Sequence, residues 1–238
     1  TQHLFRHNDM DHLRALLEEH RAGHKRCLVV TDGVFSMDGD LAPVHEMAEL
    51  AQEFDAWLMT DDAHGIGVVG AGGRGSTFAG GTKAAVDLQM GTLSKAVGGY
   101  GGYLCASKAV IDLMKTRCRT LIYSTGLPPA TVAAAIAALD IIEGDPEYTA
   151  RPVKKAQRFT RRLGLPAAES PIVPILLGDS ARTMAAQKVL EDAGYLVIGI
   201  RPPTVPEGTA RLRLTFTALH ADADIDRLAD LIADKVLV

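Results

Sequence analysis

The hydrophobic pattern alternates between short continuous runs and helical spacing. Mostly apolar runs at 27–31, 57–60 and 86–90 predict buried strands, because a strand covered on both faces lacks polar alternation. Between the runs, apolar residues recur three and four positions apart, as in the helix expected at 10–22 and in the one that Pro43 opens. Strands that alternate with helices predict the α/β class, with a mostly parallel sheet flanked by helices.

The pattern changes near residue 143, where Gly-Asp-Pro at 144–146 interrupts the chain. We therefore expect a large domain at 1–143 and a small α+β domain at 144–238. In the small domain, Ser180 is expected to cap a helix. The stretch 212–216 alternates with period two, which predicts a half-exposed antiparallel strand.

Composition narrows the class of protein. A chain of 238 residues with 47% hydrophobic residues is long enough for a sizeable core. Its net charge of −4 includes no basic block, so nothing points to nucleic acid. Three widely spaced cysteines argue against a disulfide framework or a cysteine metal site and indicate a reducing compartment. The uncharged stretch 121–139 contains two prolines, so we expect a buried loop and helix and no membrane span. No secretory signal opens the sequence, and a cytoplasmic protein is predicted.

Polar residues follow the ends of the predicted strands. Ser36 comes after the first strand, Asp61 and His64 after the second, and Thr92 and Lys95 after the third. Because ligands of open parallel sheets bind beyond the carboxyl ends of the strands, three segments deliver polar groups to one rim.

Each group has a simpler explanation when it is taken alone. Lys95 lies among small residues and glycines, where most lysines are solvated loop residues, although a desolvated lysine has a lowered pKa and becomes a nucleophile. Asp61 can be a capping residue, and His64 a hydrogen-bonded core residue. An Asp-x-x-His metal site would need further ligands at coordinating spacing, and none is evident.

The combination is more specific. A fixed carboxylate that keeps a pyridine nitrogen protonated, and a lysine that forms an imine, are what pyridoxal phosphate (PLP) requires. Asp61 and Lys95 supply these two groups. His64 and Ser36 can donate hydrogen bonds to the ring hydroxyl oxygen, and the Thr92 hydroxyl can bind phosphate.

Three motifs resemble the α-oxoamine synthases, which are PLP acyltransferases of the class II aminotransferase group. They are TDGVFSMDGD at 31–40, DDAHG at 61–65 and TLSKA at 92–96. The resemblance covers nearly the whole chain and implies the PLP-transferase type I fold. The stretch 200–214 is most similar to members that join L-alanine to pimeloyl-CoA in biotin synthesis, releasing CoA and carbon dioxide. Members that condense glycine or serine are the alternative.

The same resemblance implies roles for individual residues and a homodimer with shared active sites. Arg201 and Arg211 are expected to make surface or structural pairs only. The implied site residues are Lys95 on the PLP aldehyde, Asp61 on the pyridine nitrogen, His64 and Ser36 near the ring hydroxyl, Thr92 on the phosphate, Arg213 on the amino acid carboxylate, and Ser124 and Thr125 on the phosphate of the neighbouring subunit.

Members of this family carry a long portion before the stretch where this chain starts. It holds a glycine-rich phosphate loop and a histidine stacked on the cofactor ring. The resemblance therefore implies about half of the cofactor cage here, and we expect weak PLP binding and little activity from these 238 residues alone. A scaffold without activity is the alternative, but such a protein would not need Lys95, Asp61, His64 and Arg213 together.

The glycines at 70–75 also fit the dinucleotide-binding pattern G-x-G-x-x-G. That motif should open an amphipathic helix and be followed by an acidic residue about 20 positions later. The short glycine-rich stretch that follows meets neither condition. We expect a tight loop after the Asp61 strand in place of an NAD site.

Overall fold

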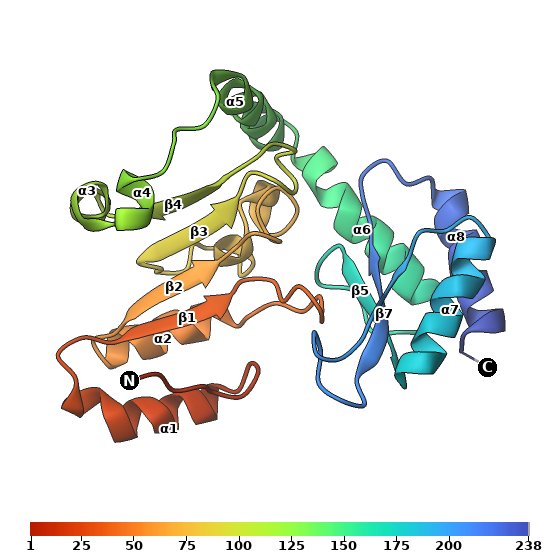
Figure 1. The fold of residues 1–238 in the computed structure, drawn as a ribbon, viewed down its shortest axis with the longest axis horizontal. Helices are drawn as coiled ribbons and strands as arrows, with labels where there is room; N and C mark the ends of the chain where they lie inside the picture. The colour runs from red at the N-terminus through yellow and green to blue at the C-terminus, as the bar shows by residue number, and fades with distance from the viewer. Residues whose placement is uncertain (238) are drawn as a thin grey trace. The chain divides into compact units, whose positions relative to one another are not determined.

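The structure is a computed structural model, and it describes residues 1–237. The chain forms two compact units (Figure 1). Unit 1 comprises Thr1–Val34 and Leu41–Pro146, and unit 2 comprises Phe35–Asp40 and the chain from Glu147 onward. The sequence predicted two contiguous domains with a boundary at 143/144. In the structure, Phe35–Asp40 belongs to unit 2 although its neighbours in sequence belong to unit 1, and the second, long segment of unit 2 begins at Glu147.

Unit 1 is built on a four-stranded sheet with the order β1-β2-β3-β4. The first three strands are parallel and β4 is antiparallel to β3, which confirms the mostly parallel α/β prediction. The third strand begins and ends two residues later than expected, so Thr92 is its last residue. The strands are β1 (Leu28–Asp32), β2 (Trp57–Asp61), β3 (Leu88–Thr92) and β4 (Gly102–Ala106).

Helices and short 3₁₀ turns connect these strands. The Asp9 side chain caps the first helix by accepting a 2.8 Å hydrogen bond from the His12 amide. The next helix packs one apolar face, with Met47 and Ala51 buried, against the sheet (Figure 1). The helical elements are α1 (Met10–His20), η1 (Arg21–Gly23), α2 (Val44–Glu53), η2 (Ala71–Gly73), η3 (Ser76–Phe78), α3 (Lys108–Arg117), α4 (Arg119–Ile122) and α5 (Pro129–Gly144).

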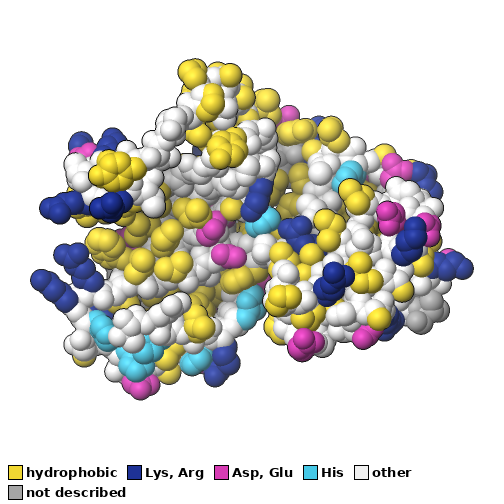
Figure 2. Space-filling model, in the orientation of Figure 1, with side chains coloured by type: hydrophobic (Ala, Val, Ile, Leu, Met, Phe, Trp, Pro, Cys, Tyr) yellow, Lys and Arg dark blue, Asp and Glu magenta, His cyan; other side chains and the backbone are white. Residues whose placement is uncertain are grey.

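Two apolar surfaces of unit 1 are exposed. Leu28, Val30 and Trp57 are about half exposed on one face of the sheet, where hydrophobic side chains gather in the view of Figure 2. Helix α5 buries only Ala135, so the prediction of a buried helix is wrong for this chain. Burial requires a partner surface, and an alanine-rich pattern without a polar side does not specify one. Within the described chain, no helix is long and apolar enough to cross a membrane.

Unit 2 is a three-stranded antiparallel sheet with the order β5-β7-β6, covered on one face by helices. The core packs Leu212 and Leu214 of the central strand against side chains such as Phe159 and Leu190. The α+β prediction for this region is confirmed. The elements are α6 (Pro146–Arg162), β5 (Ile172–Gly178), α7 (Ser180–Asp192), β6 (Ile198–Ile200), β7 (Ala210–Thr215) and α8 (Asp222–Lys235).

One detail of unit 2 differs from the sequence predictions, and one is confirmed. The cap of α7 is Asp179 and not Ser180, because the Asp179 carboxylate accepts a 2.7 Å hydrogen bond from the Arg182 amide. Strand β7 is the antiparallel central strand, and residues 212–216 alternate between buried and more exposed positions, as predicted. Arg211, on the second face just before that stretch, is only 5% exposed. That face is covered by the 35–40 segment, which the local alternation of β7 cannot indicate.

Candidate active site

The carboxyl ends of the parallel strands bring acidic and hydroxyl side chains to one edge of the unit 1 sheet. Asp32, the last residue of β1, is the register partner of Asp61, the last residue of β2. Asp61 is in turn the partner of Met90, two residues before Thr92. The Gly33 amide donates a 2.7 Å hydrogen bond to the Asp61 carbonyl and continues the ladder beyond β1. We call this edge, together with the segments that follow β2 and β3, the rim; Asp61 and Thr92 end the two strands, and His64 and Lys95 lie in the segments after them.

Asp32 is a rim residue to which the sequence analysis assigned no role. Burial raises the pKa of its carboxyl group, the Asp61 carboxylate raises it further, and the Lys95 ammonium group lowers it. Lys95 and Asp61 therefore both act electrostatically on the same carboxylate. The amine and the acid predicted for the site share this edge of unit 1. The signal that could have found Asp32 is its position at a strand end, which matches that of Asp61.

The predicted residues of the rim differ in how firmly they are held. Asp61 is half-buried, and its Oδ1 accepts a 2.9 Å hydrogen bond from the Ala63 amide, which fixes the carboxylate. His64 is half-buried in the turn that follows β2. Lys95 is exposed in the loop after β3, so the described residues do not supply the desolvation that the sequence suggested. The backbone of that loop is fixed by a 3.0 Å bond from the Gly98 amide to the Lys95 carbonyl.

Thr92 forms part of a small hydroxyl cluster. Its hydroxyl donates to the Gly101 carbonyl at 3.0 Å and shares a 2.7 Å hydrogen bond with the Ser94 hydroxyl. The Ser94 amide donates to the Thr92 hydroxyl at 3.2 Å. The predicted phosphate ligand is thus accompanied by a second hydroxyl that the sequence analysis missed. Ser94, two residues further along the same motif, was visible in the sequence.

Directly behind the rim, Asp62 is completely buried. Its Oδ2 accepts a 2.9 Å hydrogen bond from the Ser76 amide, whereas Oδ1 has no hydrogen-bond partner among the described residues. Burial raises the pKa of this carboxyl group, although the bond from Ser76 opposes the shift. A Cβ atom on Gly65 or Gly75 would lie within 2.0 Å of its oxygens, so the carboxylate fills space that glycine leaves.

The G-x-G-x-x-G stretch forms the tight loop expected from its glycines. Gly70, Gly72, Gly73 and Gly75 all have positive φ values. The stretch contains only the 3₁₀ turn η2 and opens no α-helix, so the dinucleotide-binding alternative lacks its structural context. The Ser76 amide that follows holds the loop to Asp62.

In unit 2, Ser36 and Arg213 are brought into direct contact. The Arg213 Nε donates to the Ser36 carbonyl at 2.5 Å, and its Nη1 donates to the Thr215 hydroxyl at 3.3 Å. Burial lowers the pKa of the guanidinium group. Arg211 makes structural pairs, as expected, and Arg201 is exposed.

Among the described residues, the hydrogen bonds of Ser124 and Thr125 do not bring them to the rim. Both are exposed in the connection between α4 and α5, where the Ser124 hydroxyl points to the Thr125 carbonyl at 3.5 Å. Their contact with the phosphate of a neighbouring subunit stays a prediction.

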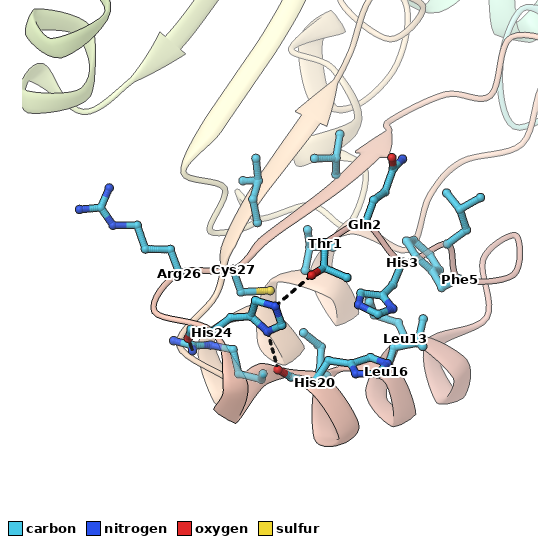
Figure 3. A pocket seen from close by; sticks show the side chains of 16 residues that line it. Thr1, Gln2, His3, Phe5, Leu13, Leu16, His20, His24, Arg26 and Cys27 are labelled. Carbon is cyan, nitrogen blue, oxygen red and sulfur yellow. Dashed lines mark hydrogen bonds between the residues drawn. The ribbon is translucent and has the colours of Figure 1, made fainter. Parts of the chain in front are cut away.

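A separate hollow of about 430 Å³ lies between the first residues, α1 and β1 (Figure 3). His24 bridges it, with hydrogen bonds at 2.9 Å to the His20 carbonyl and at 3.3 Å to the Thr1 hydroxyl. The lining of the hollow ends at Val30, two residues before the end of β1. It is therefore distinct from the rim.

Comparisons with known proteins identify relatives of the whole chain. A curated 8-amino-7-oxononanoate synthase from Methylocella silvestris is 60% identical over 98% of this chain and 66% of its own length. A serine palmitoyltransferase from S. paucimobilis, solved with bound PLP–myriocin, matches with a TM-score of 0.90 and 31% identity, over 97% of this chain and 59% of its own. The 8-amino-7-oxononanoate synthase of Francisella tularensis matches with a TM-score of 0.78 and 25% identity, over 94% of this chain and 66% of its own.

The chain spans about 60% of the length of the curated relatives that it matches. A sequence model of the family described as aminotransferase class I and II matches residues 3–232. The chain therefore belongs to the aminotransferase class I and II family, and its relatives support the α-oxoamine synthase group within it.

Proposed function

We propose that the protein carrying this chain is a PLP-dependent acyltransferase. It condenses L-alanine with pimeloyl-CoA and gives 8-amino-7-oxononanoate, CoA and carbon dioxide, a step of biotin synthesis. The observation that carries the proposal is the position of Asp61 and Lys95 around Asp32 at one edge of a parallel sheet. The 60% identity to a synthase of that name supports the substrates.

The side chains at the rim fit PLP by their chemistry. A carboxylate held by a backbone amide suits a protonated ring nitrogen, an exposed lysine suits an aldehyde, and paired hydroxyls suit a phosphate. When bound, PLP supplies an electron sink for the negative charge that develops on the α-carbon of the amino acid.

The residues of this chain then have distinct tasks. Lys95 would hold the cofactor aldehyde until the amino group of L-alanine takes its place, and the lysine amine released in this exchange would then remove the α-proton. Asp61 holds the proton of the ring nitrogen, because its carboxylate is fixed by the Ala63 amide. His64 and Ser36 donate to the ring hydroxyl oxygen, and Thr92 binds the phosphate.

Arg213 binds the carboxylate of the substrate. Its Nε donates to the Ser36 carbonyl and its Nη1 to the Thr215 hydroxyl, so Nη2 and the second N–H of Nη1 are the donors that face a carboxylate. Partial burial strengthens such a pair, because the competing water is reduced.

The active form is a homodimer in the cytoplasm. Exposed apolar side chains on α5, including Ile136 and Ile141, follow the exposed Ser124 and Thr125, which supports a second copy that shares this region. Three free cysteines are consistent with a reducing compartment.

Two measurements test the function. Reduction with borohydride in the presence of PLP, followed by peptide mapping, is expected to label Lys95; a Lys95→Ala variant is the control, and a label at another lysine would contradict the assignment. Turnover is then compared for L-alanine, glycine and L-serine with pimeloyl-, acetyl- and palmitoyl-CoA. Preference for glycine or serine would show a different member of the group, and no label with no turnover would indicate a scaffold.

A further inference from the structure

The 35–40 loop, defined as Phe35–Asp40, is packed closely against the sheet of unit 2. The Phe35 amide donates to the Asp40 carbonyl at 3.0 Å, and the Gly39 amide donates to the Phe35 carbonyl at 2.8 Å. Gly39 has a φ of +76°, and a Cβ atom there would lie 2.2 Å from the Ile172 carbonyl oxygen. The loop therefore has one compact shape, and it approaches the first residue of β5 where only glycine fits.

Arg211 joins this loop to the central strand. It is 5% exposed, and its Nη1 donates to the Met37 carbonyl at 3.1 Å and to the Asp38 carboxylate at 2.5 Å. Its Nε donates to the Thr209 carbonyl at 3.0 Å. A buried guanidinium group must be paired, so the loop and the strand depend on each other.

Arg213 lies two residues further along β7, on the same face of the sheet. Its Nε donates to the Ser36 carbonyl, next to the Met37 carbonyl that Arg211 holds. Because the guanidinium group is planar, fixing the Nε bond fixes the direction of both Nη groups. The shape of the 35–40 loop thus sets the direction in which Arg213 presents its remaining donors.

We propose that Arg211 and Asp38 are positioning residues for the carboxylate of the amino acid substrate. They hold the 35–40 loop in the shape in which the Ser36 carbonyl orients Arg213, and they do not touch the substrate themselves. This inference rests on the proposed function, because it takes Arg213 as the group that binds the carboxylate.

The test uses Asp38→Ala and Arg211→Met in the protein as the cell makes it. Loss of the anchor lets the Arg213 guanidinium group adopt other directions, which weakens binding of the carboxylate in the ground state and the transition state alike. We expect the KM for L-alanine to rise about tenfold while kcat changes less than about threefold. The KM for pimeloyl-CoA is expected to stay unchanged. Asp38 is exposed, so its variant remains informative if Arg211→Met fails to fold.

Hydrogen exchange of the 35–40 amides, measured without substrate, gives a second readout. We expect faster exchange in both variants and an intermediate rate in Arg211→Lys, which keeps the charge but loses the planar fork. The matched control is Arg162→Met, which removes an exposed pair with Asp230 in the same unit and is expected to change neither readout.

An unchanged KM for L-alanine in variants whose loop exchanges faster would overturn the positioning role. Unchanged exchange would overturn the anchoring of the loop. If the wild-type protein turns over no amino acid, the proposed function fails and the positioning role falls with it, whereas the exchange rates still decide whether Arg211 and Asp38 hold the loop.

Discussion

The two sheets of this chain hold their polar side chains in different ways. At the rim of unit 1, Asp61 ends a strand and Lys95 lies exposed in the loop beyond β3. In unit 2, Arg211 and Arg213 lie within the central strand, and hydrogen bonds from both tie the 35–40 loop to it. A strand end leaves side chains free of the core, whereas a central strand makes them part of the packing. Substitutions at the rim should therefore reduce turnover and leave the free energy of unfolding unchanged. Substitutions of buried residues in β7 should lower the free energy of unfolding.

Lys95→Ala is expected to have the largest effect on turnover. It removes both the amine that binds the cofactor and the base for the α-proton, so kcat should fall by about 10³-fold or more. Because Lys95 is exposed, the melting temperature of the protein without cofactor should not change. Steady-state kinetics and thermal unfolding measure the two quantities.

Lys83→Ala is the matched control, because Lys83 is another exposed lysine of unit 1. It should retain the turnover of the wild type. Residual activity of Lys95→Ala within tenfold of the wild type would remove Lys95 from the mechanism, and a large drop in melting temperature would show that the rim is part of the packing after all.

Leu212→Ala tests the opposite property in unit 2. Leu212 is completely buried in β7, so we expect a loss of about 3 kcal/mol in the free energy of unfolding. Leu28→Ala in β1 is the matched comparison, because Leu28 is 48% exposed, and a loss below about 1 kcal/mol is expected. Urea unfolding measures both. Equal losses would mean that the sheet of unit 1 is covered in solution, and the contrast between the units would disappear.

Asp61→Asn should reduce turnover by about 10²-fold. A neutral amide cannot hold the proton of the ring nitrogen, but it can still accept the hydrogen bond from the Ala63 amide. We therefore expect an intact fold, retained cofactor absorbance and a lower kcat. Asp11→Asn, at an exposed position of α1, serves as the control. Turnover of Asp61→Asn equal to that of the wild type would exclude Asp61 as the partner of the ring nitrogen.

Local patterns sufficed for most of the fold and for much of the rim. Continuous apolar runs predicted β1 and β2, and the polar residues that follow them gave Asp61 and His64. The class of each unit followed from the spacing of strands and helices. These features are encoded by neighbouring residues, so a single sequence is enough to find them.

The features that the sequence did not predict depend on contacts between residues that are distant in the chain. Arg211 was expected to pair, but its partner Asp38 lies 173 positions earlier, and no property of the β7 sequence indicates it. Whether α5 is buried depends on a partner surface, and the sequence pattern of the helix does not indicate one. Asp62 was missed because two adjacent acids look alike in sequence, and only the strand geometry shows which of them points into the glycine-lined interior.

Asp62→Asn is expected to have the smallest effect of these substitutions, a change in the pH dependence of the free energy of unfolding. Burial raises the pKa of Asp62 in the folded state, so the folded protein keeps this proton at pH values where the unfolded chain has released it. The contribution of Asp62 to the free energy of unfolding therefore decreases as the pH rises from the unfolded pKa to the folded pKa. Below the unfolded value the penalty is absent, and above the folded value it is complete.

The asparagine side chain cannot titrate. The free energy of unfolding of the variant minus that of the wild type should therefore increase with pH across this window and stay constant above it. Urea unfolding between about pH 3 and pH 8 gives the difference. Asp55→Asn is the control, because the Asp55 side chain is fully exposed and its loss should leave the pH dependence of the wild type in place. A difference between Asp62→Asn and the wild type that stays flat, or falls with pH, would mean that water or a counter-ion reaches the Asp62 carboxylate and that the glycine-lined interior behind the rim is open.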